Sequence, residues 1–205
     1  MMKRPGLTAS LLRAAAMLLV VATVLAPAKA HHRSPGPTSG IAIPSLSHGQ
    51  MAVYDANRAA ILALAERQPV PQQRFSRILN YARIQYTICL WGLMPGAIDN
   101  DDSPFNECAH AYLAATRALL TAINETAAPS REAQALAAKV DRELLLNGTL
   151  VLCSFSAETF DTADVVLPHW SEMPGHLPSL AALGSLALAA FGGIALALRA
   201  GRRRR

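Results

Sequence analysis

The chain has 205 residues, 52% of them hydrophobic, and a formal net charge of +5. That length provides one ordinary globular core together with short targeting or membrane segments. Four of the 19 basic residues precede residue 31, five follow residue 198, and all 14 acids lie between, so the middle of the chain carries about −4 and the positive total does not indicate nucleic-acid binding.

Residues 1–30 have the pattern of a secretory signal peptide. A basic start is followed by the short apolar run 14–25 and by Ala28-Lys29-Ala30, which fits an Ala-x-Ala cleavage site. An uncleaved membrane anchor is the alternative interpretation of the same pattern. Cleavage after Ala30 makes His31 the first residue of the exported chain.

This predicted mature start has copper-binding chemistry, because a free α-amine and the imidazole of an N-terminal histidine chelate copper together. The candidate ligands are His31, His32, His48 and Met51. In its first residue the segment resembles the N-terminal histidine brace of some copper proteins. The alternative is that both leading histidines are ordinary polar residues, since residues 31–47 are rich in Pro, Gly and Ser and predict a flexible linker.

Apolar residues recur every three or four positions along four segments, which is the signature of core-facing helices. The predicted helices lie near 49–68, 71–94, 104–125 and 130–165. Ser47 and Gln50 form a capping box before the first, Ser103 fits the N-cap of the third, and Gly148 is a break signal within the fourth. These features predict an all-α fold, an exported four-helix up-down bundle occupying residues 48–168.

The chain has three cysteines. Cys89 and Cys108 lie on the apolar stripes of the second and third predicted helices, near the same level of an antiparallel pair. A disulfide between them closes a loop of roughly 20 residues and stabilises the fold by about 3 kcal/mol on chain-entropy grounds. Two buried thiols are the alternative, and an exported compartment favours the disulfide. Cys153 is expected to be buried and unpaired.

Two further segments carry ligand-type side chains with spacings that do not suit a metal. The acidic loop 99–102 is dense in oxygen donors but lacks the glycine and glutamate positions of an EF-hand. Residues 169–176 contain His169, Glu172 and His176, but a Pro-Gly pair interrupts any helix that would align them. We therefore interpret the first as a turn and the second as a juxtamembrane linker.

Residues 177–198 carry no charge, and a run of that length crosses a bilayer. The tail 199–205 is rich in arginine, which the positive-inside rule places in the cytoplasm. The sequence thus predicts a single-pass inner-membrane protein with a periplasmic body. The span and the arginines are similar to exosortase-type C-terminal sorting signals, whose Pro-Glu-Pro core is missing here, so permanent anchor and removable signal stay open.

The sequence contains no motif for haem attachment, dithiol redox chemistry, phosphate binding, a nucleophile elbow or a zinc-protease helix. It therefore favours a non-enzymatic, membrane-anchored accessory or scaffold subunit of a cell-envelope complex. Its expected partners are the membrane and a membrane protein or a second copy of the chain, with no nucleic acid. No cofactor is expected for such a subunit. Periplasmic copper handling through His31 is the alternative function, with copper as its cofactor.

Overall fold

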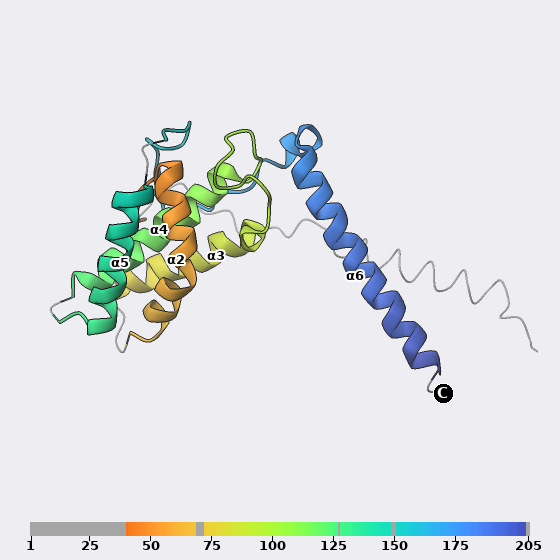
Figure 1. The fold of residues 1–205 in the computed structure, drawn as a ribbon, viewed down its shortest axis with the longest axis horizontal. Coiled ribbons are helices and arrows are strands. Elements are labelled where there is room, and N and C mark those ends of the chain that lie inside the picture. Colours follow the sequence, from red (N-terminus) through yellow and green to blue (C-terminus); the bar gives the residue numbers. More distant parts are fainter. Residues whose placement is uncertain (1–39, 69–71, 127, 149–150, 204–205) are drawn as a thin grey trace, which may run out of the picture. The chain divides into compact units, whose positions relative to one another are not determined.

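The computed structural model describes residues 40–68, 72–126, 128–148 and 151–203, which are mostly helical (Figure 1). The helices are α2 His48–Glu66, α3 Gln73–Ile88, α4 Asn106–Asn124, α5 Arg131–Asn147 and α6 Leu177–Arg203. The strands are β1 Ala42–Pro44 and β2 Thr159–Asp161, and the 3₁₀ helices are η1 Leu90–Gly92 and η2 Trp170–Gly175. The predicted signal peptide, His31 and His32 lie outside the described residues.

Helix α4 lies at the centre of the core. Apart from Glu107, every residue from Asn106 to Thr116 is buried. Helices α2 and α3 pack against it, and α5 packs against both α2 and α4. A helix that is surrounded in this way needs small residues where its neighbours approach, and α4 supplies a series of fully buried alanines between positions 109 and 115.

The predicted helix starts are right for α2 and wrong for α4. At α2, the Gln50 backbone N–H donates to Ser47 Oγ at 3.3 Å and the Ser47 N–H donates to Gln50 Oε1 at 3.0 Å, which completes the capping box. Helix α4 instead begins at Asn106 behind Phe105, which makes no side-chain cap. Ser103 accepts a hydrogen bond from the Phe105 N–H and belongs to the preceding turns.

The second and fourth predicted helices are shorter than expected. The backbone turns into the left-handed region after α3, with φ of 53° at Leu90, 55° at Trp91 and 64° at Gly92. Helix α5 ends at Asn147, where the Gly148 N–H closes the last turn on the Leu144 carbonyl at 2.9 Å. The apolar residues after 150, which the sequence suggested as helix, form an irregular segment leading to β2.

Residues 40–47 are not the flexible linker that their composition predicts. Strand β1 pairs antiparallel with β2 in the register Ala42↔Asp161, Ile43↔Phe160 and Pro44↔Thr159. Ile43 and Leu46 are each 1% exposed, so this segment contributes to the core. A strand of three residues is stable here because it buries apolar side chains against α4 while its backbone groups pair with a segment more than 110 positions later.

Cys89 and Cys108 lie opposite each other between the end of α3 and the start of α4. Their Cα atoms are 5.8 Å apart, within the range of a disulfide, and the structure joins their sulfurs. The Gln85 side-chain N–H group faces both sulfurs, at 3.4 Å from Cys89 Sγ and 3.3 Å from Cys108 Sγ, and also donates to the Val166 carbonyl. This fully buried amide ties the segment before η2 to the predicted disulfide.

Residues 169–176 also differ from the predicted linker, because η2 is held against the start of α4. The His169 N–H donates to the Pro104 carbonyl at 2.8 Å, and His169 Nε2 lies 2.7 Å from Glu107 Oε2. The Trp170 ring meets the Phe105 ring edge-on, with centroids 5.5 Å apart. These contacts hold the segment directly before α6 against the start of α4.

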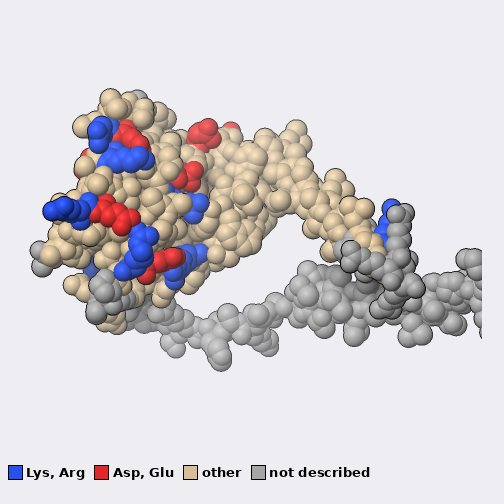
Figure 2. All heavy atoms as spheres, turned by 60° about the horizontal axis from the view of Figure 1, so that its bottom comes forward, with Lys and Arg blue, Asp and Glu red and all other residues tan. Residues whose placement is uncertain are grey.

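Within the described part of the chain, α6 is long and apolar enough over Leu177–Gly201 to cross a membrane, judged by length and composition. Figure 2 shows the charged side chains gathered over the helical body, whereas the surface of α6 is uncharged until its C-terminal end. Arg199 is the first charged residue within this helix.

Candidate metal site

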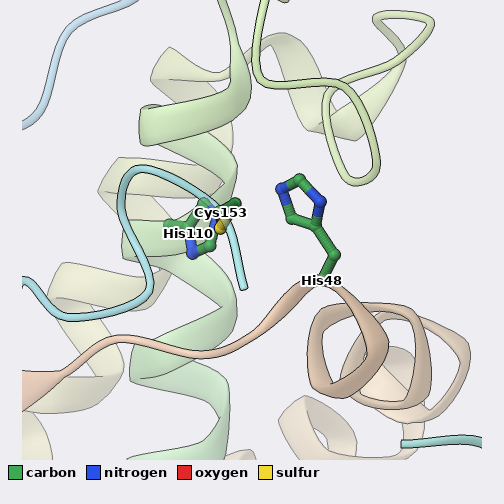
Figure 3. Close-up of side chains that lie close together, drawn as sticks. All are labelled: His48, His110 and Cys153. Atoms are coloured by element: carbon green, nitrogen blue, oxygen red, sulfur yellow. Dashed lines mark hydrogen bonds between the residues drawn. The ribbon is translucent and has the colours of Figure 1, made fainter. Parts of the chain in front are cut away.

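Three side chains with metal-ligand chemistry converge beside the N-terminus of α2 (Figure 3). His48 is the first residue of α2, His110 projects from α4, and Cys153 comes from the irregular segment after α5. One ligand atom from each lies within 4.8 Å of the other two. We call these three residues the histidine–cysteine cluster.

The β1–β2 pairing brings the third member of this cluster into place. Beyond the strands the pairing continues, since the Ser45 N–H donates to the Glu158 carbonyl at 3.0 Å and the His48 N–H donates to the Val151 carbonyl at 3.2 Å. The segment that carries Cys153 therefore lies against the start of α2. A tight turn fixes Cys153 locally, because its N–H donates to Ser156 Oγ at 2.9 Å.

His110 is the most enclosed member of the cluster, with 0% of its surface exposed. Its Nδ1 lies 2.9 Å from Ser45 Oγ and its Nε2 lies 3.1 Å from Cys153 Sγ. Burial and, to a smaller extent, the neighbouring His48 lower the pKa of His110 to about 4, while Asp101 opposes the shift. The imidazole is therefore neutral near pH 7, which is the form that binds metals.

Two polar side chains hold His48, one from the segment between α3 and α4 and the other from the first residue of α4. Its Nε2 lies 3.1 Å from Asp101 Oδ1 and 3.3 Å from the Asn106 amide nitrogen, and its side chain is 10% exposed. The charged carboxylate is the stronger acceptor for the Nε2 proton. Asn106 Oδ1 is buried and has no hydrogen-bond partner among the described residues, so a buried acceptor beside His48 is left unsatisfied.

Cys153 lies at the open edge of the cluster, half-buried and outside any disulfide. Its sulfur is 2.9 Å from Ser156 Oγ, and the next aromatic residue, Phe155, packs its ring against His110 at a centroid distance of 5.8 Å. Two imidazoles and one thiolate form a donor set that suits zinc and copper. The cluster therefore has the chemistry of a transition-metal site.

The Cys153–His110 pair also has the spacing of a thiol nucleophile and its base, with Ser45 behind the imidazole. Such a pair needs a substrate cleft beside it. The cavity that has Phe75 and Ile123 in its wall does not serve this pair, because it lies at the far end of α4. The nucleophile interpretation also leaves His48 without a role, whereas a metal site uses all three side chains.

Of the four copper ligands that the sequence suggested, only His48 and Met51 lie within the described residues. His48 is in the cluster, but Met51 is fully buried in the hydrophobic core and is not one of its members. In the segment before α6, His169 contacts Glu107 and Glu172, whereas His176 contacts Asn100 and Ser179. These two histidines have different partners and do not form the zinc set considered from the sequence.

The sequence prediction missed His110 and Cys153 as ligands. His110 had a detectable signal, since it is an imidazole among the apolar residues of the third predicted helix, one turn after Asn106. Cys153 had none, because its position depends on strand pairing between segments that were predicted as linker and helix. Asp101 was noticed for its charge, but its contact with His48 depends on the same tertiary arrangement.

Comparisons of the chain with protein-family models, with curated proteins and with solved structures gave no match. The histidine–cysteine cluster and the apolar helix α6 are therefore the features that bear on function.

Proposed function

We propose that this protein binds a single transition-metal ion, zinc or copper(I), at His48, His110 and Cys153. The convergence of their three ligand atoms within 4.8 Å supports this proposal. Metal–nitrogen bonds of about 2.0 Å and metal–sulfur bonds of about 2.3 Å require ligand atoms about 3.4–3.8 Å apart. The cluster is near that spacing, so small movements of the half-buried Cys153 turn suffice for an ion to enter.

A metal ion binds the deprotonated forms of these three ligands. The thiol of Cys153 must lose its proton to bind, and His48 must be neutral. His110 is already neutral near pH 7, because burial lowers its pKa to about 4.

We also propose that the site is carried by an exported four-helix up-down bundle, held at the inner membrane by α6 with its arginine-rich tail in the cytoplasm. The length and apolar composition of α6 support the anchor. The positive-inside rule gives the orientation. A signal peptide over residues 1–30 completes this topology and belongs to the same proposal.

A second candidate function is that of a non-enzymatic accessory or scaffold subunit of a membrane complex. The observation in its favour is a group of exposed apolar side chains after the middle of α5, with Leu145 88% and Leu152 75% exposed. A scaffold predicts co-purification of the full chain with one stable membrane complex in a fixed ratio. Purification from native membranes as a single species would contradict it.

The metal proposal is tested on the full chain, purified in detergent under argon so that Cys153 stays reduced. Cobalt(II) is the probe, because a thiolate ligand gives a charge-transfer band in the near ultraviolet. We expect one cobalt per chain and loss of the band in Cys153→Ser. His169→Ala is the matched control, since His169 lies outside the cluster. Unchanged binding by Cys153→Ser would contradict the proposal.

The N-terminal copper hypothesis is a separate proposal, and a titration of the full chain and its variants with copper distinguishes it. His31→Ala removes the imidazole of the predicted mature start and leaves the cluster intact. If the cluster is the site, His31→Ala binds metal like the parent protein. If copper binding disappears in His31→Ala and survives in Cys153→Ser, the site is at the N-terminus.

A further inference from the structure

We infer that Asp101 is the positioning residue of the metal site and that the fourth coordination position of the metal is open to an external donor, water or a small anion. This inference rests on the proposed function. In this inference the Asp101 carboxylate orients a ligand and does not bind the metal. The water or anion at the fourth position can then exchange. The alternative is a closed, four-ligand site in which Asp101 itself binds the ion.

Both oxygens of the Asp101 carboxylate are engaged by the segments that carry the ligands. Oδ1 lies 3.1 Å from His48 Nε2. Oδ2 accepts from the Ser154 N–H at 3.2 Å and from the Ser154 hydroxyl at 3.4 Å. One carboxylate thus holds the first ligand and the neighbour of the third, and it would have to release one of them to reach the metal.

Each imidazole then presents one nitrogen to the ion and uses the other for orientation. A metal-bound histidine usually donates its remaining N–H to a carboxylate or another oxygen, which fixes the ring and raises its basicity. For His48 this oxygen belongs to Asp101, which contacts Nε2, so the positioning role requires the ion to bind at Nδ1. For His110 it belongs to Ser45, which leaves Nε2 on the side of Cys153.

The described residues offer three ligands in this cluster, and its edge is partly exposed. The Asp101 side chain is 45% exposed and Cys153 is half-buried. Structural zinc sites use four protein ligands, whereas sites that exchange a ligand or do chemistry keep one position for water or an anion. The arrangement here corresponds to the second type.

The test compares Asp101→Asn with Asp102→Asn in the full chain, using cobalt(II) affinity and the cobalt spectrum. Asp102 is the adjacent carboxylate and lies outside the cluster. Its described hydrogen bond is made by its backbone N–H, which donates to the Asn100 side chain. We expect Asp101→Asn to bind cobalt about 10- to 100-fold more weakly, because the loss of a partner that orients a metal ligand usually lowers affinity by that factor. Its thiolate band should keep its position, because the ligands are unchanged. Asp102→Asn should match the parent protein.

Azide is the probe of the open position. Added to the cobalt-loaded parent protein, it should shift the visible d–d bands in a saturable way. Equal affinities for Asp101→Asn and Asp102→Asn would overturn the positioning role. No azide effect, together with a changed cobalt geometry in Asp101→Asn, would make Asp101 the fourth ligand. A parent protein that binds no cobalt would overturn the proposed function itself, an outcome distinct from both.

Discussion

Helix α4 carries two different links only two residues apart. Cys108 is joined to Cys89 at the end of α3, beneath the buried amide of Gln85. His110 meets Cys153 and His48 through non-covalent contacts at the edge of the core. The first link connects two consecutive helices through a short loop. The second connects α4 to the start of α2 and to a segment that follows α5.

The comparison shows how two neighbouring links stabilise one core in different ways. The disulfide acts mainly on the unfolded chain, by restricting a loop between neighbouring helices. The histidine–cysteine cluster joins distant segments through groups that a metal and protons both affect. The first link should therefore stabilise the fold at any pH and metal concentration. The second should make the stability depend on metal and pH.

The largest expected effect comes from removing the disulfide. The double variant Cys89→Ser, Cys108→Ser should lower the free energy of unfolding by about 2–5 kcal/mol, because the unfolded chain regains the entropy of a closed loop. Urea denaturation without reductant measures the change. Cys153→Ser, without added metal, is the control and should stay within about 1 kcal/mol of the parent. Equal stabilities of the double variant and the parent would show that the link is not formed.

Acid should weaken the second link in the metal-free protein. The pKa of His110 is about 4 in the folded chain and 6.5 in its ordinary state, so the unfolded chain binds the proton first as pH falls. The stability contributed by neutral His110 is complete above pH 6.5 and is lost by about pH 4, a change of about 3 kcal/mol.

This acid effect is measured by urea denaturation of the metal-free protein between pH 7 and pH 4. His110→Gln keeps a polar side chain and removes the titration, so its stability should fall less over that interval. If both proteins lose stability in parallel, a different group causes the acid sensitivity.

Much of the first link was predictable from the sequence, and the second was not, for a physical reason. Cys89 and Cys108 lie on periodic apolar stripes, and a short loop makes consecutive helices antiparallel neighbours. Strands β1 and β2 have three residues each, too few to show an alternating pattern. Without their pairing, nothing in the sequence places Cys153 over His48.

His48 itself shows the same limit. It was predicted as a ligand together with Met51, which is near it in the sequence, but Met51 faces the core. Its partners in the structure are 62 and 105 positions away. The left-handed residues Leu90 and Trp91 were missed as well, because neither is a residue type that signals a positive φ.

Metal addition should raise stability through the second link alone. At a free metal concentration 100 times the dissociation constant, the gain is about 2.7 kcal/mol for a site that exists only in the folded chain. Thermal unfolding with and without zinc measures it. Cys153→Ser should show little gain, whereas the double disulfide variant should still respond. A gain that is equal in Cys153→Ser and the parent would locate the metal elsewhere.

The smallest expected effect concerns the turn between Cys89 and the acidic loop. Trp91 has a φ of 55° and is 52% exposed, so it occupies a left-handed conformation that favours glycine. Trp91→Gly should be more stable than Trp91→Ala by about 0.5–1 kcal/mol. Denaturation midpoints of the two variants provide the comparison, and a less stable glycine variant would contradict the assigned backbone conformation.

X-ray absorption of the zinc-loaded full chain tests the central proposal most directly. The histidine–cysteine cluster predicts imidazole nitrogens at about 2.0–2.1 Å and one sulfur at about 2.3 Å from zinc. Cys153→Ser should lose the sulfur, and His31→Ala should leave the spectrum unchanged. A first shell of nitrogen and oxygen alone in the parent protein would contradict metal binding at His48, His110 and Cys153.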